Sequence, residues 1–245
     1  MGAPRFFVSL PLAPADAGST VELPPAIAHH AVRVVRLAAG DALTLFDGTG
    51  GEYSATLVRA DREGATVRLD RYAAVAREAP LDVTLAQAIA ANDAMDYAIR
   101  KAVELGTAAI QPLVTARSAP LPPGERGDRR LAHWRGVVVA ACEQCGRNRI
   151  PPVAAPAPLR EWVAAWPGRG VVLTPDAPGT LATLAAPVAP IALVVGPEGG
   201  FAELELDAAR AAGFDAVALG PRVLRTETAA VAALAAMQAL WGDLR

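Results

Sequence analysis

The first 75 residues contain short runs in which apolar and polar positions alternate, the pattern of half-buried β-strands. Tyr53–Arg59 and Ala65–Tyr72 alternate on either side of Asp61-Arg62-Glu63-Gly64, which predicts a hairpin with a glycine-containing loop. A helix of about Ala26–Leu37 is expected to interrupt the strands. Several short strands joined by turns indicate a small β-barrel, and we expect residues 76–80 to be the linker that follows it.

From Leu81 onward the pattern changes to strands that alternate with helices. One predicted strand starts at Leu81. Four more are predicted at Ala109–Val114, Gly170–Leu173, Ile191–Val195 and Ala216–Leu219. Predicted helices cover Met95–Val103, Asp128–Gly146, Glu203–Ala212 and Thr226–Trp241 approximately, whereas 151–158 and 175–190 are expected to be loops. Such alternation is typical of a parallel sheet with helices on both faces. The sequence therefore predicts two domains, 1–75 and 81–245, the second of them α/β.

Composition and charge narrow the class of protein. The hydrophobic fraction is 53%, ample for a core, and the net charge of −2 argues against a purely electrostatic nucleic-acid binder. Lys101 is the only lysine, so nearly every cation is an arginine, whose planar fork suits phosphate. The first ten residues lack the pattern of a signal peptide, and the longest apolar stretch, Ala229–Trp241, is too short to cross a bilayer. We expect a cytoplasmic protein with no membrane partner.

The cysteines and histidines do not predict a metal site. Cys142 and Cys145 have C-x-x-C spacing, but no second pair follows, and His29, His30 and His133 are not in zinc-finger spacing. The cysteine pair falls late in a helical stretch, not at a helix start as in a redox motif. We interpret the two thiols as structural or incidental.

A glycine-rich segment, Val194-Val195-Gly196-Pro197-Glu198-Gly199-Gly200, follows an apolar strand and precedes a helix. Ligands of open α/β sheets bind just beyond the carboxyl ends of strands, where glycine allows close approach of the backbone. The segment does not fit the dinucleotide fingerprint G-x-G-x-x-G, and Pro197 lacks an N–H that a phosphate cradle would use. Taken alone, such a turn is more often structural than functional.

A second polar segment lies between a strand and a helix, Leu219-Gly220-Pro221-Arg222-Val223-Leu224-Arg225-Thr226-Glu227-Thr228-Ala229. Arg225 and Glu227 could form a surface ion pair of little energetic value. Two such loops at adjacent strand ends instead favour a shared pocket.

A third segment, Ala140 to Arg149, places Glu143 and Arg147 four residues apart on one helical face, the spacing of an ordinary ion pair. Residues 100–149 nevertheless contain nine basic and four acidic side chains in a chain of negative net charge. This excess indicates a surface for an anionic polymer, with a solvated helix face as the alternative.

These three segments, with Lys101-Ala102-Val103-Glu104-Leu105-Gly106, closely resemble the ribosomal RNA small subunit methyltransferase E family, and His29-His30 through Asp41 resembles its amino-terminal domain. The resemblance covers Pro4 to Leu244. It implies a PUA-like β-barrel followed by a SPOUT domain, an α/β methyltransferase domain with a trefoil-knotted backbone. It also implies a homodimer that methylates N3 of one uridine of 16S rRNA in the 30S subunit, with S-adenosylmethionine as cofactor. One departure is Ala202, where the family usually has a Ser or Thr helix cap, which should weaken the helix start by ~1 kcal/mol.

The resemblance and the loops together give the expected site residues. For catalysis, we expect Arg225, with Arg222 second, to stabilise charge on the uracil, and Glu198, Glu227 or water to act as base. Residues expected to contact the cofactor are Leu173, Thr174, Gly196, Pro197, Glu198, Gly199, Gly200, Leu219, Gly220, Arg222, Val223, Leu224, Arg225, Thr228 and Ala229. Residues expected to contact RNA are Arg5, Arg33, Arg36, Lys101, Arg147 and Arg149.

Two other functions stay open from the sequence. A SPOUT enzyme could methylate a ribose 2′-hydroxyl, although the barrel and the motif pairing make this the weaker hypothesis. A non-catalytic RNA-binding protein could keep the same fold, but the full Arg225-Thr226-Glu227-Thr228 set argues against loss of activity. Finally, Ala229–Trp241 is apolar on more than one side, which favours burial against a partner subunit as well as its own sheet.

Overall fold

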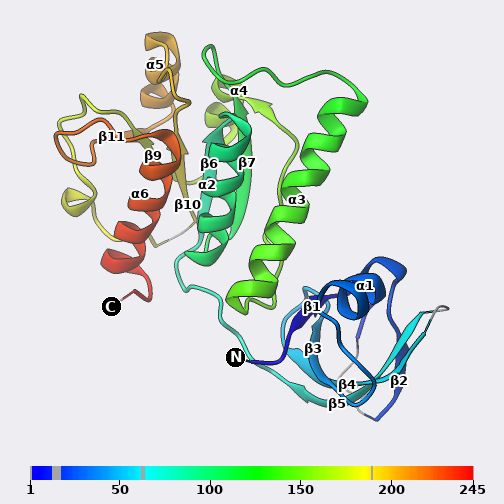
Figure 1. Ribbon diagram of the computed structural model, residues 1–245. Helices are drawn as coiled ribbons and strands as arrows, with labels where there is room; N and C mark the ends of the chain where they lie inside the picture. Colours follow the sequence, from blue (N-terminus) through cyan, green and yellow to red (C-terminus); the bar gives the residue numbers. More distant parts are fainter. Residues whose placement is uncertain (1, 13–17, 62–63, 189, 245) are drawn as a thin grey trace. The chain divides into compact units, whose positions relative to one another are not determined.

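A computed structural model describes residues 2–12, 18–61, 64–188 and 190–244. The chain forms two compact units, one of residues 1–78 and 142–150, the other of residues 79–141 and 151–245 (Figure 1). Residues 142–150 thus belong with the amino-terminal unit, although the sequence placed them in the second domain. A continuous helical pattern cannot reveal this division, because it depends on contacts far apart in the chain.

The first unit is a five-stranded sheet in the order β1-β3-β4-β5-β2. Its elements are β1 (Arg5–Phe7), β2 (Thr20–Glu22), α1 (Pro25–His29), η2 (His30–Val34), β3 (Ala42–Phe46), β4 (Glu52–Ala60) and β5 (Ala65–Ala73). Strands β4 and β5 pair antiparallel, which confirms the predicted hairpin, although Arg62 and Glu63 of its loop lie outside the described residues. The alternating apolar side chains, among them Leu57, Val67 and Leu69, form the core of this unit.

The predicted helix of Ala26–Leu37 is shorter in the structure. Helix α1 passes into the π-helical turn η2, which ends at Val34. Arg36 then adopts a φ of 65°, in the left-handed region that a helix interior does not contain. This backbone turn ends the helix before Leu37.

Glu52 is the centre of a polar network in the first unit. Its Oε2 accepts hydrogen bonds from Arg5 Nη1 at 2.6 Å, Arg77 Nη1 at 2.9 Å and Asn148 Nδ2 at 3.1 Å. Burial raises the pKa of this carboxyl, but the hydrogen bonds from Arg77, Arg5 and Asn148 outweigh burial and lower the pKa from 4.5 to about 2. The network therefore holds Glu52 ionised.

Acid should weaken the first unit through Glu52. A carboxyl whose pKa is lower in the folded state stabilises the fold above its unfolded pKa, and this contribution is lost as the pH falls. We expect the difference in unfolding free energy between wild type and Glu52→Gln to be largest at neutral pH. It should shrink as the pH falls from 4.5 to about 2. Denaturant titrations at several pH values measure it, with the exposed Glu125→Gln as control. A difference that does not change with pH would contradict the prediction.

The second unit is a six-stranded, fully parallel sheet in the order β11-β9-β10-β6-β7-β8. Its strands are β6 (Val83–Ala88), β7 (Ala109–Val114), β8 (Ala157–Pro158), β9 (Arg169–Leu173), β10 (Ile191–Val195) and β11 (Phe214–Val217). Its helical segments are α2 (Asn92–Glu104), α3 (Glu125–Cys145, whose end lies in the first unit), α4 (Leu159–Ala165), η3 (Leu181–Thr183), α5 (Glu203–Ala211) and α6 (Thr226–Trp241). The predicted strand–helix alternation is confirmed.

Helices cover both faces of this sheet. Helices α2 and α6 pack on one face through a core that includes Ala98, Ala233 and Leu234 (Figure 1). Helices α4 and α5 pack on the other face, against Val172 and Val194. The central strands β6 and β10 are buried along their whole length, as expected for a parallel sheet covered twice.

In the second unit, one helix was not predicted and two elements begin before their predicted starts. Helix α4 lies in a stretch for which no helix was predicted, and its buried Leu159 and Val163 are too few to give a clear helical period. Strand β11 begins at Phe214, two residues before the predicted start, because Gly213 ends the preceding turn with a φ of 84°. Helix α3 begins at Glu125, three residues before the predicted start.

Candidate active site at the carboxyl ends of three strands

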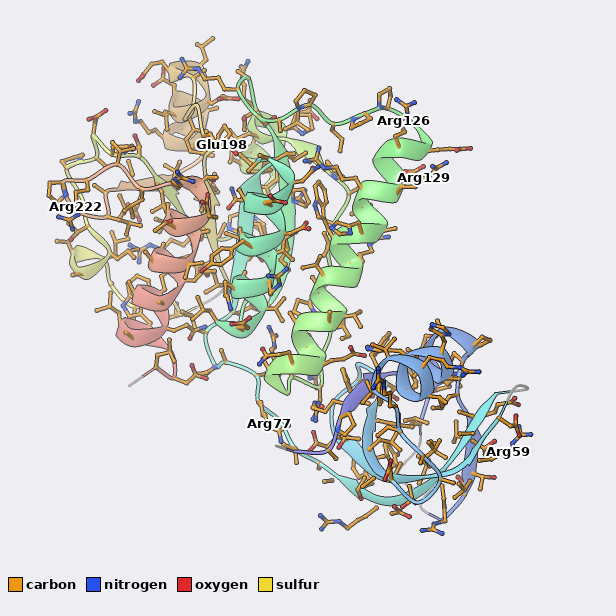
Figure 2. The ribbon with its side chains drawn as sticks, viewed as in Figure 1. Arg59, Arg77, Arg126, Arg129, Glu198 and Arg222 are labelled. Atoms are coloured by element: carbon orange, nitrogen blue, oxygen red, sulfur yellow. The ribbon has the colours of Figure 1, made fainter. Side chains whose placement is uncertain are left out.

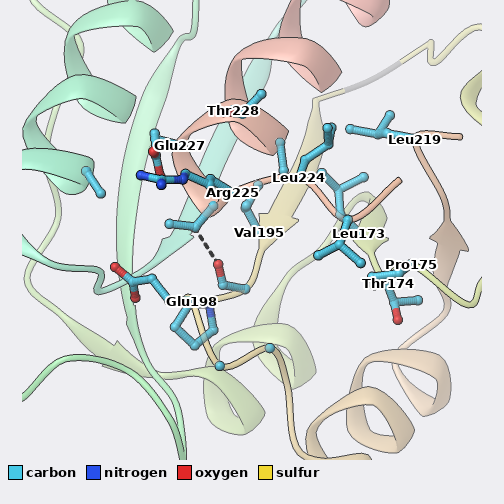
Figure 3. Close-up of a pocket in the computed structure, with 18 of the residues that line it drawn as sticks. Leu173, Thr174, Pro175, Val195, Glu198, Leu219, Leu224, Arg225, Glu227 and Thr228 are labelled. Carbon is cyan, nitrogen blue, oxygen red and sulfur yellow. Dashed lines mark hydrogen bonds between the residues drawn. The ribbon is translucent and has the colours of Figure 1, made fainter. Parts of the chain in front are cut away.

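A pocket of about 1030 Å³ opens at the carboxyl ends of β9, β10 and β11 in the second unit (Figure 3). Leu173, Thr174 and Pro175 come from the end of β9, the glycine segment follows β10, and residues 219–229 follow β11. Strand β9 lies between β10 and β11, so the two predicted loops follow strands that are not adjacent in the sheet, although the loops themselves are in contact through Thr226 and Gly196. This is the edge at which open α/β sheets bind ligands.

Every residue expected to contact the cofactor lines this pocket. These are Leu173, Thr174, Gly196, Pro197, Glu198, Gly199, Gly200, Leu219, Gly220, Arg222, Val223, Leu224, Arg225, Thr228 and Ala229. Leu173, Val195, Leu219 and Leu224 give one side of the pocket an apolar wall (Figure 3). Arg225, Glu198 and Glu227 place charged groups at the same cavity. A second cavity, of about 820 Å³ between α4 and α5, is lined by other residues.

The glycine segment forms a tight turn that neighbouring elements hold in place. Within the turn, the Gly200 N–H donates to the Pro197 carbonyl at 2.9 Å, and Gly200 has a φ of 68°, which glycine tolerates at little cost. From outside, the Thr226 hydroxyl donates to the Gly196 carbonyl at 2.5 Å. The shape of the pocket therefore depends on contacts that the turn makes with the start of α6.

Glu198, a candidate base, also accepts a hydrogen bond from the backbone at the start of α2. Its Oε1 accepts a hydrogen bond from the Ala91 N–H at 2.9 Å, at the residue that precedes α2. This bond satisfies one of the backbone donors that a helix start leaves without an intrahelical partner. Glu198 therefore links the glycine turn to α2, a role that its position in the sequence did not reveal.

Arg225 and Glu227 both lie at the start of α6 and both line the pocket (Figure 3). The Arg225 side chain is exposed and does not cap the helix. Among the described residues no hydrogen bond or ion pair joins Arg225 to Glu227, so the hypothesis of a simple surface ion pair has no support in the structure. Arg222 is also exposed at the pocket, in the loop before α6 (Figure 2).

Gln87 was not identified from the sequence, nor was the structural role of Thr226, which lines the pocket. Gln87 and Thr226 are nearly inaccessible to solvent, and Gln87 Nε2 donates to the Thr226 hydroxyl at 2.9 Å. The chain of hydrogen bonds from Gln87 through Thr226 to Gly196 connects β6, α6 and the glycine turn. A glutamine inside the apolar strand 83–88 was the available signal, because a buried amide requires partners. Ala91, Asp93, Ala94 and Tyr97 of the α2 region also line the pocket.

The structure corrects two of the expected RNA contacts. Arg147 is 5% exposed and donates from Nε to Glu78 Oε2 at 2.9 Å, so its guanidinium is not presented to a phosphate. Arg5 forms an ion pair with Glu52 at 2.6 Å and lies over the Phe46 ring. Arg147 is thus buried and Arg5 partly buried in the first unit, and both guanidinium groups are paired with carboxylates of that unit.

The other expected RNA contacts are differently placed. Arg33, Arg36 and Arg149 are exposed in the first unit. Lys101, in the second unit, pairs with Glu104 at 2.8 Å, and Arg129 pairs with Glu125 at 2.9 Å. Part of the positive charge of residues 100–149 is thus compensated inside the chain.

The thiols of the C-x-x-C pair are free, and Cys142 is buried. Burial raises the pKa of the Cys142 thiol to about 12, and its S–H donates to the Arg149 carbonyl at 3.6 Å. A thiol held in its protonated form is a poor nucleophile and metal ligand. In the described ranges, no group of three His, Cys, Asp or Glu side chains is arranged to hold a metal ion. The helices of those ranges are too short or too polar to span a membrane.

Comparison with known proteins gives matches over most of the chain. Residues 77–238 match the family model of an RNA methyltransferase domain, and residues 23–70 match that of an RNA methyltransferase PUA domain. A ribosomal RNA small subunit methyltransferase E from Mycobacterium bovis is 40% identical over 220 residues, which cover 86% of this chain and 83% of that protein. The protein of the same name from Buchnera aphidicola is 30% identical, with 98% of each chain covered.

Solved structures agree with these matches. A ribosomal RNA small subunit methyltransferase E from Neisseria gonorrhoeae, bound to S-adenosyl methionine, has a TM-score of 0.92 and 39% identity, with both chains fully covered. A Legionella pneumophila protein in complex with the bound cofactor SAM has a TM-score of 0.95 and 36% identity, also with both chains fully covered.

Proposed function

This chain belongs to the ribosomal RNA small subunit methyltransferase E family, and from that membership we propose that it methylates 16S rRNA of the 30S subunit with S-adenosylmethionine as methyl donor. The finer proposal is that the target is N3 of one uridine. The observation that carries the methyltransferase proposal is the shared pocket at the ends of β9, β10 and β11, in which the residues of both family strings meet, whereas the N3 target follows from the family resemblance.

The residues of the pocket fit S-adenosylmethionine. The apolar wall of Leu173, Val195, Leu219 and Leu224 suits an adenine ring, and the glycine turn brings backbone groups close to the ligand. A cavity of about 1030 Å³ is large enough for a molecule of this size. Bound there, the cofactor would supply a methyl group on a positively charged sulfur.

The chemistry at uridine requires three things from the protein. The base must be held out of its stack, its N3 must align with the methyl group, and the N3 proton must leave. As the new N3–carbon bond forms and the sulfur–carbon bond breaks, negative charge on the uracil carbonyl oxygens needs stabilisation. We assign this stabilisation to Arg225. The proton passes to Glu227, Glu198 or water, with Glu198 the weaker candidate because its Oε1 already accepts the Ala91 N–H.

Nucleoside analysis of ribosomal RNA tests this function. RNA from a strain that lacks the gene should have lost 3-methyluridine from 16S rRNA, and purified protein with S-adenosylmethionine should restore it on 30S subunits. Loss of a 2′-O-methylated nucleoside instead would favour a ribose methyltransferase. Unchanged nucleosides would favour a non-catalytic RNA-binding protein and would contradict the proposal.

We expect the first unit, which contains the PUA domain match, to contact RNA through exposed arginines. Reversal of Arg33, Arg36 and Arg149 to Glu should weaken RNA binding and lower its salt dependence by a slope of roughly 0.7–0.9 per lost phosphate contact. Binding of 16S rRNA fragments at several salt concentrations measures the slope. The exposed Arg160→Glu in the second unit, a single charge reversal, is the control and should leave the slope unchanged. A triple variant with the wild-type slope would remove these arginines from the interface.

We also propose that the protein is a homodimer. Helix α6 buries Ala233, Leu234 and Met237, but Val231 and Ala235 stay partly accessible, and Leu240 is 42% exposed. A helix that is apolar on all sides is most stable when both sides are covered. Light scattering at micromolar concentration should give twice the chain mass of 25.2 kDa. A particle of the chain mass would contradict the proposal.

A further inference from the structure

Arg117 lies in the positively charged stretch 100–149 and is not among the residues that line the pocket, yet it contacts the glycine turn. It follows β7, and its Nη1 donates to the Gly199 carbonyl at 2.9 Å and to the Phe201 carbonyl at 3.4 Å. Two other contacts hold the start of the turn: the Thr226 hydroxyl donates to the Gly196 carbonyl, and the Glu198 side chain accepts the Ala91 N–H. Arg117 contacts the end of the turn, at Gly199 and Phe201.

The segment that carries Arg117 is fixed to its surroundings. The Ala119 N–H donates to the Ile89 carbonyl at 2.7 Å, and Arg130 Nη1 donates to the Pro120 carbonyl at 2.9 Å. The Ala116 N–H donates to Glu205 Oε1 at 2.8 Å. These contacts tie the segment to the chain before α2, to α3 and to α5. A guanidinium on so constrained a backbone can hold another loop in one conformation.

The Glu205 carboxylate joins this segment to the far end of the glycine turn. Glu205 is buried, and its Oε2 accepts the Ala202 N–H at 2.8 Å while its Oε1 accepts the Ala116 N–H. This bond is the glutamate half of a capping box and satisfies the Ala202 N–H; the other half, a Ser or Thr oxygen that would accept an N–H of the first helical turn, is absent. Arg117 and Glu205 thus connect the turn to the same segment at two points.

The packing of Gly199 agrees with a close fit between the turn and Arg117. A Cβ atom at position 199 would lie 3.2 Å from Arg117 Cβ and 3.4 Å from its Cδ, tighter than ordinary contact. Glycine at 199 therefore lets the Arg117 stem lie against the backbone while its guanidinium reaches two carbonyls. Both carbonyls are thereby directed toward the arginine.

We propose that Arg117 is a positioning residue for the cofactor pocket, which sets the conformation of the 199–201 backbone and so the affinity for S-adenosylmethionine. The inference rests on the proposed function, since the pocket is taken to hold that cofactor. Arg117 is one of the cations of the positively charged stretch 100–149, for which the sequence predicted RNA contact. Its bonds to two backbone carbonyls assign it to the pocket instead.

The test compares Arg117→Ala, Arg117→Lys and the control Arg129→Ala, whose arginine is exposed on α3 and pairs with Glu125. Calorimetry without RNA should give about tenfold weaker binding of S-adenosylhomocysteine for Arg117→Ala, the scale of a lost charge-assisted hydrogen bond. Arg117→Lys should recover part of the affinity, since an ammonium can still donate to a carbonyl. Steady-state kinetics of Arg117→Ala should show a raised KM for S-adenosylmethionine with a smaller change in kcat. Melting temperatures should stay near wild type, and Arg129→Ala should bind like wild type.

The outcomes separate the inference from the function it rests on. Wild-type affinity in Arg117→Ala, with a lower salt slope for RNA binding, would make Arg117 an RNA contact and overturn the inference alone. Should Arg117→Ala not fold, the affinity of Arg117→Lys decides, and a wild-type value would overturn the inference. Wild-type protein that binds no S-adenosylhomocysteine would overturn the proposed function and the inference with it.

Discussion

Replacement of Arg225 by alanine is expected to lower kcat by about 10²–10³-fold, the scale for loss of one donor to a developing negative charge. Arg225 is exposed, lines the pocket, and makes no side-chain cap to α6, so its guanidinium is available to the substrate. If it acts only in the transition state, binding of S-adenosylhomocysteine should hardly change. Arg225→Lys should restore activity only in part, because an ammonium lacks the planar fork of donors.

Single-turnover methyl transfer on 30S subunits at saturating cofactor measures this effect without the complication of product release. Arg222→Ala is the matched comparison, since Arg222 is a second exposed arginine at the same pocket, and we expect a smaller loss of rate. If Arg225 merely shaped the loop through Glu227, then Glu227→Ala would be equally harmful and both variants would bind cofactor poorly. A normal single-turnover rate for Arg225→Ala would end its catalytic assignment.

The parts of the fold that local pattern determines were predicted well. Three such patterns are confirmed: the alternation in β4 and β5, the apolar run of β10, and the long apolar stretch of α6. Each depends only on residues that are close in the sequence. Helix α4 was missed because it follows a stretch rich in proline and has only seven residues. The trefoil knot that the family resemblance implies stays a prediction, since it concerns the path of the chain and not any local pattern.

The candidate site also has a part that the sequence predicts and a part that it does not. Its lining residues occur in two contiguous strings, so the sequence could assemble them once the strands were placed. Gln87, Arg117 and Glu205 act through partners 80 to 140 positions away, roughly, and no spacing rule reports such contacts. Arg147 shows the opposite error. The many cations near it in the sequence predicted an exposed RNA-binding position. In the structure Arg147 is buried against Glu78, a tertiary contact that composition cannot predict.

Charge reversal at Arg147 is therefore expected to unfold the first unit and not simply to weaken RNA binding. Arg147 is 5% exposed and donates to Glu78 from Nε and Nη2, and the Arg149 N–H donates to the second oxygen of Glu78 at 3.3 Å. Loss of one partner from a buried ion pair leaves the other charge without compensation, which costs about 3–5 kcal/mol. Arg147→Glu also places a second carboxylate beside Glu78, so the loss should lie at the upper end of this range.

Arg149→Glu is the matched control, since it makes the same change of charge two residues away at an exposed position. Denaturant titration of the full chain should give a large loss of unfolding free energy for Arg147→Glu and a small one for Arg149→Glu. Replacement of both partners, Glu78→Leu with Arg147→Met, should recover much of the stability, because an apolar pair leaves no buried charge unpaired. Equal stability of Arg147→Glu and Arg149→Glu would mean that Arg147 is accessible in solution, and would return it to the list of candidate RNA contacts.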